Sequence, residues 1–236
     1  MSRERGDTVD GAEFVIFDND GVLVDTESAA NAVLAGLLTS YGLPTTVEDS
    51  FSLYLGTSLS YVRAEAEEKL GRALPAAFED VYHQRFFERL GHGLEPIPGV
   101  NRALSDLGLG FCVASSGSKE RIERTLRQVD LWRHFDGRAF SAESVGKSKP
   151  APDLFLYAAE KMGVDPSQCI VVEDSPWGIQ AANSAGMTSW GFAHRTPVER
   201  LGAATGGILF SMDELGKIRG SSRGVSYPTP PSGGEG

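Results

Sequence analysis

Two aspartates separated by a single residue follow the first apolar run of the chain, and such a pair could bind a metal ion or transfer protons. The run covers residues 14–17, and the next four residues are Asp18, Asn19, Asp20 and Gly21. Side chains alternate along an extended chain, so Asp18 and Asp20 project to one side and Asn19 to the other. Asp and Gly are also common in turns, so this pair alone fits a plain loop equally well.

Three further polar groups flank later elements of the chain. They are Ser115, Ser116, Gly117 and Ser118 after residues 111–114, Lys149 and Pro150 ahead of residues 153–162, and Glu173, Asp174 and Ser175 after residues 169–172. Each has an ordinary explanation as a helix cap, a surface charge or a pair of loop acids. Parallel strands, however, bring their carboxyl ends to one edge, where open α/β sheets bind ligands. Four such groups in order therefore predict one shared site.

The elements that would position these groups are short apolar runs alternating with helical patterns. The runs cover residues 14–17, 111–114, 169–172, 189–192 and 208–210, and they lack polar alternation, which is typical of strands covered on both faces. Helical patterns cover residues 119–129, 153–162 and 179–185, and the last two end before Gly163 and Gly186. This alternation predicts an α/β fold with a doubly wound, Rossmann-like parallel sheet.

One long stretch interrupts that rhythm. Residues 26–94 have helical patterns, clearest at 26–41, 58–72 and 76–90, and these are separated by turn-forming segments. We therefore predict a core domain of residues 1–24 and 96–217, with an inserted helical domain of residues 25–95. Residues 218–236 are rich in Gly, Ser and Pro and predict a disordered tail.

Composition restricts the possible partners. The 236 residues are 41% hydrophobic and 23% charged, with no apolar run near the ~18 residues of a membrane span. The polar N-terminal segment does not resemble a secretory signal, so we expect a cytoplasmic protein. The net charge of -10 and the lack of a Lys/Arg cluster argue against nucleic acid. Cys112 and Cys169 lie in apolar runs and are expected to be buried.

The chain resembles the haloacid dehalogenase (HAD) superfamily of phosphatases. Its four motifs occur in order as FDNDGVLVD, VASSG, KPAPD and VVEDS, and the similarity spans roughly residues 14–214. Within the superfamily, the helical insertion resembles the cap that follows the first motif. The sequence is most similar to the branch of β-phosphoglucomutases and sugar phosphatases. The resemblance implies a Mg2+-dependent phosphatase that acts on small phosphorylated metabolites, such as sugar or sugar-acid phosphates.

The resemblance also implies a role for each motif residue. Asp18 would be the nucleophile that forms an aspartyl-phosphate, and Asp20 the general acid and base. Lys149 and Ser115 would bind the phosphoryl group, together with backbone N–H groups at Ser116 and Gly117.

The implied metal ligands are three residues with a fourth beside them. Mg2+ would be bound by Asp18, the backbone carbonyl of Asp20 and Asp174, with Glu173 adjacent. These are the hard oxygen ligands that this ion prefers, and its charge would offset the repulsion between carboxylate and phosphate.

Particular residues of the chain argue against other activities of the superfamily. Asp20 argues against the dehalogenases and phosphonate hydrolases, which lack an acid there. Phosphosugar mutases similar to this chain carry an arginine in a cap loop and a histidine on the first cap helix, where we align Leu59 and Ala30. A phosphatase is therefore favoured over a β-phosphoglucomutase-like mutase, although Arg63 or Arg72 could replace that arginine.

The helical insertion should determine substrate specificity. Glu27, Thr57 and Ser58 are candidate substrate contacts, and helix capping explains residues at such positions equally well. A non-catalytic phosphometabolite-binding protein is the alternative from another class, but it would be expected to have lost at least one motif residue. We expect a monomer or weak dimer.

Overall fold

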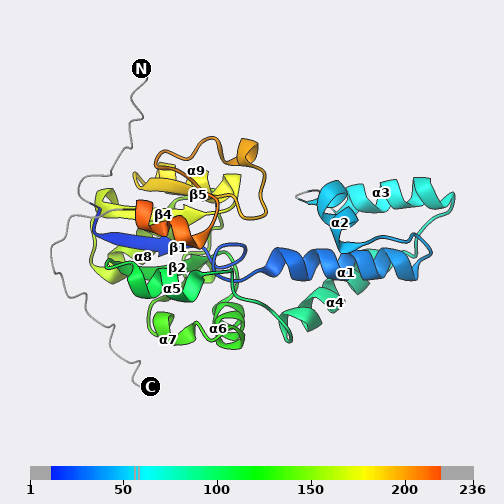
Figure 1. Cartoon of the computed structure of the whole chain (residues 1–236), viewed down its shortest axis with the longest axis horizontal. Coiled ribbons are helices and arrows are strands. Elements are labelled where there is room, and N and C mark those ends of the chain that lie inside the picture. Colours follow the sequence, from blue (N-terminus) through cyan, green and yellow to red (C-terminus); the bar gives the residue numbers. More distant parts are fainter. Residues whose placement is uncertain (1–11, 56, 58, 219–236) are drawn as a thin grey trace. The chain divides into compact units, whose positions relative to one another are not determined.

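The computed structural model describes residues 12–55, 57 and 59–218, and the chain divides into two units. The core unit contains residues 12–24 and 96–218, and the helical unit contains residues 25–95 (Figure 1). Ile218, which the sequence assigned to the tail, is buried in the core unit because its side chain is apolar. Residues 219–236 of the predicted tail lie outside the described residues.

A six-stranded parallel sheet forms the centre of the core unit. Its strand order is β3-β2-β1-β4-β5-β6, with every neighbouring pair parallel. The strands are β1 (Phe14–Phe17), β2 (Gly110–Ser115), β3 (Ala139–Ser141), β4 (Cys169–Glu173), β5 (Thr188–Phe192) and β6 (Gly207–Leu209). The predicted α/β parallel fold is confirmed. Strand β3 was missed because its three residues include a single large apolar side chain, Phe140, and so form no apolar run.

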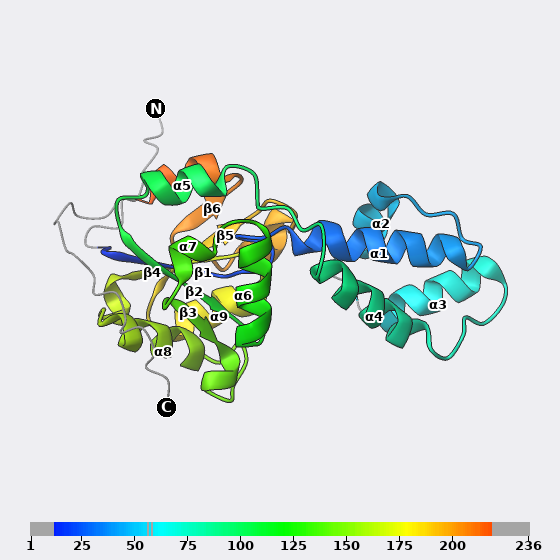
Figure 2. The ribbon, with the colours of Figure 1, turned by 90° about the horizontal axis from the view of Figure 1, so that it is seen from below.

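Helices cover both faces of this sheet, as the continuous apolar runs predicted. They are α5 (Val100–Asp106), α6 (Lys119–Gln128), α7 (Trp132–Phe135), α8 (Asp153–Met162) and α9 (Pro176–Ser184). Figure 2 shows α5 and α8 on opposite sides of the strands. On the side of α7, the ring of Phe111 packs against those of Phe17 and Phe135.

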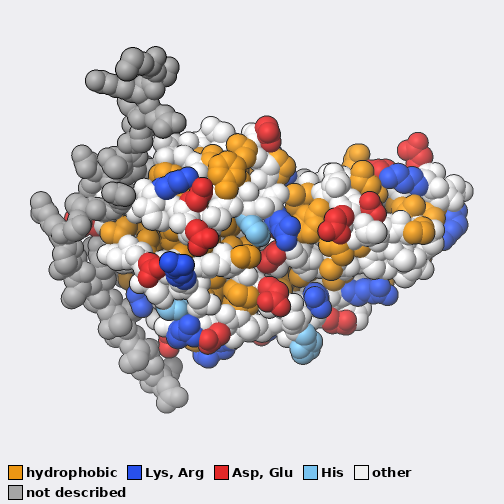
Figure 3. All heavy atoms as spheres, in the orientation of Figure 1, with side chains coloured by type: hydrophobic (Ala, Val, Ile, Leu, Met, Phe, Trp, Pro, Cys, Tyr) orange, Lys and Arg blue, Asp and Glu red, His pale blue; other side chains and the backbone are white. Residues whose placement is uncertain are grey.

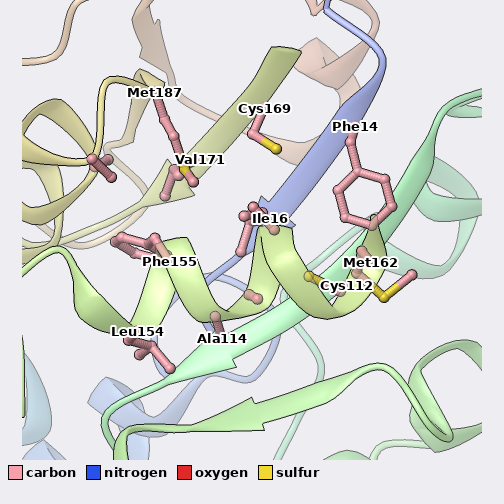
Figure 4. Close-up of a cluster of buried hydrophobic side chains, with 14 of the residues drawn as sticks. Phe14, Ile16, Cys112, Ala114, Leu154, Phe155, Met162, Cys169, Val171 and Met187 are labelled. Atoms are coloured by element: carbon pink, nitrogen blue, oxygen red, sulfur yellow. The ribbon is translucent and has the colours of Figure 1, made fainter. Parts of the chain in front are cut away.

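A large buried cluster lies between the sheet and helices α8 and α9. Alternate residues of β1 and β4, among them Phe14, Ile16 and Val171, meet Phe155 and other side chains of α8 there (Figure 4). Because side chains alternate along a strand, the residues that continue this series past the strand ends face the same side. On β1 that residue is Asp18, which links the packing of the core directly to the site.

The helical unit has its own hydrophobic core. It contains α1 (Thr26–Ser40), α2 (Val47–Tyr54), α3 (Leu59–Leu70) and α4 (Phe78–Leu90). Leucines of α1, with Tyr54 and Phe78, fill the space between these helices. Helix α2 was not singled out from the sequence because it is short, although Thr46 and Asp49 form a capping box at its start.

The helices, the surface charges and the two cysteines can be compared with what the composition predicted. None of the described helices is long and apolar enough to cross a membrane. Figure 3 shows acidic side chains interspersed with Lys and Arg on the visible face of the core unit. Cys112 and Cys169 are buried, as predicted, and both are free thiols.

The packing predicts a difference between two phenylalanines of the core unit. Phe14→Ala should lower the free energy of unfolding by about 3–5 kcal/mol, because Phe14 is fully buried and truncation leaves a cavity. Phe210→Ala should change it by less than about 0.5 kcal/mol, because that ring is 54% exposed. Urea unfolding followed by tryptophan fluorescence measures this, since Trp132, Trp177 and Trp190 all belong to the core unit. Equal effects would contradict the assignment of Phe14 to the core.

Candidate active site

A buried lysine connects the carboxyl ends of neighbouring strands. The Nζ atom of Lys149 lies 2.6 Å from Asp18 Oδ1 and 2.6 Å from Glu173 Oε1. It also donates to the backbone carbonyl of Ala114, at 3.3 Å. The Lys149 side chain is 6% exposed. The residue that follows β1 and one residue each of β4 and β2 therefore provide one acceptor, and the predicted convergence of Asp18, Lys149 and Glu173 is present in the structure.

The position of Lys149 follows from the chain just before α8. Asp18 and Glu173 continue the alternate series of β1 and β4 that faces α8 and α9. Lys149 lies four residues ahead of α8, and its ammonium group lies 4.8 Å from the ring centre of Phe155 in that helix. The lysine is thus supported by a ring of the core and by two carboxylates.

Burial and neighbouring charges change the pKa values of both Asp18 and Lys149. Burial raises the pKa of Asp18 to about 7, against the opposing effect of the Lys149 charge, while Glu173 and Asp20 raise it further. Burial alone would lower the pKa of Lys149, but the carboxylates of Asp18 and Glu173 outweigh it and raise that pKa above its usual range. Lys149 is therefore a permanent cation.

Glu173 has partners that differ from those predicted. Its Oε1 accepts from Lys149, and its Oε2 accepts from both the backbone N–H and the hydroxyl of Ser175, each at 2.8 Å. A Cβ atom on Gly178, in helix α9, would lie 1.9 Å from the carboxyl carbon of Glu173. Both oxygens are engaged with Lys149 and the following turn, which favours an anchoring role, and the place beside the metal that the resemblance implies for Glu173 stays a prediction.

Asp174 lies against the backbone that follows β1. A Cβ atom on Gly21 would lie 2.0 Å from Asp174 Oδ2, and Gly21 has a φ of +79°. Only glycine allows this close approach. The chain at Asp20 and Gly21 and the carboxylate of Asp174 therefore meet at the edge where Asp18 lies.

These residues fit a hard divalent cation. Among the described residues, no group of three or more His, Cys, Asp and Glu side chains could hold a metal ion. A site here would use the carboxylates of Asp18 and Asp174, the carbonyl of Asp20 and water. Mg2+ commonly binds with such a small number of carboxylates and several waters.

The loop after β2 places the predicted phosphate-binding residues beside these groups. Ser115 is buried, and its hydroxyl accepts from the backbone N–H of Gly117 at 3.0 Å. The carbonyl of Gly117 in turn accepts from the hydroxyl of Ser141, at 2.7 Å. These bonds define the loop that also contains Ser116, at the end of the strand next to β1.

The predicted specificity residues belong to the helical unit. Glu27 lies in the first turn of α1, which is capped by Asp25 rather than by Thr26. The hydroxyl of Thr57 donates to the carbonyl of Tyr54 at 2.8 Å, which is a local role at the end of α2. Ser58 lies outside the described residues. Their substrate contacts stay predictions.

Two residues that sequence reasoning missed lie close to predicted ones. Arg121 of α6 forms an ion pair with Asp20, with Nη2 3.0 Å from Oδ2. In the helical unit, burial and then the Glu27 carboxylate raise the pKa of Tyr82 to about 12. Neither residue belongs to a motif, so only the three-dimensional contact reveals it.

Comparison with known proteins agrees with the fold and identifies the family. The family model of the haloacid dehalogenase-like hydrolases matches residues 13–186. A 6-phosphogluconate phosphatase of Escherichia coli is 29% identical, over 88% of this chain and 96% of that protein. A fructose-1-phosphate phosphatase of the same organism is 33% identical, over 73% of this chain and 92% of that protein. The crystal structure of a haloacid dehalogenase-like protein of Agrobacterium tumefaciens has a TM-score of 0.77 and 35% identity, covering 88% of this chain and 97% of that one.

The chain belongs to the haloacid dehalogenase-like hydrolase family. It is a phosphoric monoester hydrolase, which confirms the enzyme class that the four motifs predicted.

The raised pKa of Asp18 predicts a pH dependence of stability. Folded protein without metal holds the Asp18 proton more tightly than the unfolded chain, so this stabilisation is complete below the ordinary pKa and is lost as pH rises through about 7. In EDTA, raising the pH from 5 to 8 should therefore lower the unfolding free energy of the wild type relative to Asp18→Asn, as measured by urea titration.

Asp153→Asn is the matched control. A hydrogen bond from Lys147 lowers the pKa of Asp153, so this carboxyl is ionised in both states across that range. The difference in unfolding free energy between Asp153→Asn and the wild type should stay constant from pH 5 to 8. A constant difference for Asp18→Asn as well would contradict the assigned pKa shift.

Proposed function

We propose that this enzyme hydrolyses phosphate monoesters of sugars or sugar acids with Mg2+, through an aspartyl-phosphate on Asp18. The observation that carries the proposal is the placement of Lys149, 2.6 Å from both Asp18 and Glu173 at the carboxyl edge of the sheet. A permanent cation beside a buried carboxylate lowers the electrostatic cost of bringing a phosphate ester to that carboxylate.

The reaction follows as two displacements. In the first, an oxygen of Asp18 attacks phosphorus, the ester bond breaks, and Asp20 donates a proton to the departing oxygen. In the second, water attacks phosphorus, Asp20 takes its proton, and the bond to Asp18 breaks with release of phosphate. Asp20 is returned to its protonated state at the end of each cycle.

The remaining residues bind and neutralise the phosphoryl group. Mg2+ held by Asp18, the Asp20 carbonyl and Asp174 would supply positive charge between the nucleophile and the phosphate. Lys149 faces the same group as a fixed cation. Ser115 and the backbone N–H groups of its loop would donate to phosphoryl oxygens. Glu173 keeps Lys149 in place.

The substrate class is supported by the relatives. The two phosphatases compared above are named for a sugar-acid phosphate and a sugar phosphate, and the chain covers most of both proteins. We propose that the helical unit acts as a cap that contacts the part of the substrate beyond the phosphate. Glu27, Thr57 and Ser58 are its candidate contacts, and Tyr82 beside Glu27 is added to them.

Hydrolysis is favoured over mutase activity by the residues that a second phosphate would need. Leu59 packs against the apolar core of the helical unit. Arg63 is paired with Glu67 and donates to the carbonyl of Leu74, and Arg72 donates to the carbonyl of Tyr41. The arginines that could have replaced the mutase arginine therefore have other partners. Cytoplasmic location and a monomer or weak dimer stay predictions.

The proposed roles of the two aspartates predict different losses. Asp18→Asn should abolish formation of the phosphorylated enzyme, because the amide is not a nucleophile. Asp20→Asn should slow turnover by at least about 100-fold, because both proton transfers are lost. Acid-quenched incubation with labelled substrate, followed by counting of protein-bound phosphate, measures the phosphorylated enzyme, and release of free phosphate measures turnover. Wild-type turnover in Asp18→Asn would falsify the nucleophile assignment.

Removal of the metal should abolish activity. Phosphate release from p-nitrophenyl phosphate and from a panel of sugar and sugar-acid phosphates is expected to stop in EDTA and to return with excess Mg2+. Independently of activity, Mg2+ should raise the melting temperature of the wild type but not that of Asp174→Asn.

The same panel separates the alternatives. Metal-independent activity, or equal melting shifts in the two proteins, would argue against the proposed metal site. Strong formation of phosphosugar isomers on addition of a sugar bisphosphate would favour the mutase. Absence of hydrolysis across the whole panel would favour a phosphometabolite-binding protein.

A further inference from the structure

Helix α6 contacts the Asn19 and Asp20 segment at two points, although the two are about a hundred residues apart in the chain. The first point is the ion pair between Arg121 Nη2 and Asp20 Oδ2, at 3.0 Å and 101 positions apart. The side chains of Arg121 and Asp20 are 31% and 27% exposed. The pair is thus shielded from solvent more than an ordinary surface ion pair.

The second point lies one helical turn further along α6. Thr125 is fully buried, and its Oγ1 accepts from Asn19 Nδ2 at 3.2 Å. The same nitrogen lies 3.3 Å from Asp20 Oδ1. The two carboxylate oxygens of Asp20 therefore accept from two different side chains, Arg121 and Asn19. Arg121 lies on α6, and Asn19 is hydrogen-bonded to Thr125 on the same face of that helix.

The path of the Arg121 side chain is set by the loop before α6. The hydroxyl of Ser118 caps the helix by accepting from the backbone N–H of Arg121, at 3.2 Å. Gly117 has no side chain, and a Cβ atom there would lie 3.3 Å from Arg121 Cδ. The loop that is proposed to bind phosphate thus also leaves room for the arginine to reach Asp20.

We propose that Arg121 is a positioning residue that holds the carboxyl group of Asp20 in the orientation required for proton transfer. This inference rests on the proposed function, because it assigns both proton transfers to Asp20. In the proposed reaction, Asp20 donates a proton to the leaving oxygen and then takes one from the attacking water. Displacement of a catalytic group by about 1 Å can lower the rate ~10²-fold. Two fixed donors restrict the rotation that would cause such a displacement.

A direct role of Arg121 in binding phosphate is the rival explanation. Its Nε atom is buried and has no hydrogen-bond partner in the described part of the chain, so it could donate to a phosphoryl oxygen. The positioning role and the phosphate-binding role predict different effects of the leaving group on the loss of activity. A p-nitrophenolate ion leaves without being protonated, whereas the alkoxide of a sugar requires the proton from Asp20.

The test compares kcat/KM for p-nitrophenyl phosphate with kcat/KM for the sugar phosphate that the wild type hydrolyses fastest. Arg121→Met keeps the aliphatic stem and removes the charge, and Arg121→Lys restores a cation. Arg127→Met is the matched control on the same helix, because Arg127 pairs with Glu123 on the exposed surface. Circular dichroism and urea unfolding check that the variants fold, and Arg121→Gln repeats the test if the methionine variant does not.

The expected result is a roughly 10- to 100-fold loss of kcat/KM for the sugar phosphate in Arg121→Met, with a much smaller loss for p-nitrophenyl phosphate. Arg121→Lys should recover part of the activity, and Arg127→Met should match the wild type. In the Asp20→Asn background, Arg121→Met should cause little additional loss, because the arginine acts through Asp20.

Other results would overturn the inference. Equal losses for the two substrates would show that Arg121 binds the phosphoryl group, and unchanged kinetics would show that the ion pair has no role in turnover. Additive losses with Asp20→Asn would show that the arginine does not act through Asp20. Failure of the proposed function differs from failure of this inference, because the wild type itself would then show no metal-dependent hydrolysis.

Discussion

The rest of the site depends on one buried cation shared by two carboxylates. Lys149 lies between Asp18 and Glu173, and removal of the lysine would leave two buried carboxylates without their shared counter-ion. The described charges at this edge are also unequal, since Asp18, Asp20, Glu173 and Asp174 outnumber Lys149 and Arg121. Burial is the main cause of the raised Asp18 pKa, and the excess of carboxylate adds to it and favours the divalent cation that we propose.

Two glycines let these charges approach each other. Gly178 leaves room for the Glu173 carboxyl group, and Gly21 does the same for that of Asp174, so a methyl group at either position would overlap the carboxylate. Glu173 and Asp174 are adjacent in sequence, and alternation along the strand turns them to opposite sides. One therefore anchors Lys149 on the side of α8 and α9, and the other meets the backbone after β1.

Much of this arrangement could be predicted from the sequence, because it follows from parallel strands and from motif order. Asp18 and Asp174 follow strands whose carboxyl ends any such sheet brings to one edge, and Lys149 precedes helix α8, which packs on the sheet. The role of Glu173 was missed, although the alternation that links Phe14 and Ile16 to Asp18 also links Cys169 and Val171 to it. The pairing of Arg121 with Asp20 could not be predicted, because the packing of α6 decides which helical side chain reaches a loop 101 positions away.

The pairing pattern also bears on how an acidic protein binds an anion. The chain has a net charge of -10, so attraction of a phosphate ester must come from local groups. The two cations described at this edge are each already matched, Lys149 by two carboxylates and Arg121 by Asp20. Their positive charge is therefore partly neutralised before a phosphate ester arrives. Under the proposed mechanism, Lys149 needs the help of the proposed metal ion and of backbone N–H groups to balance the charge of the arriving phosphoryl group, so the metal would contribute to binding as well as to chemistry.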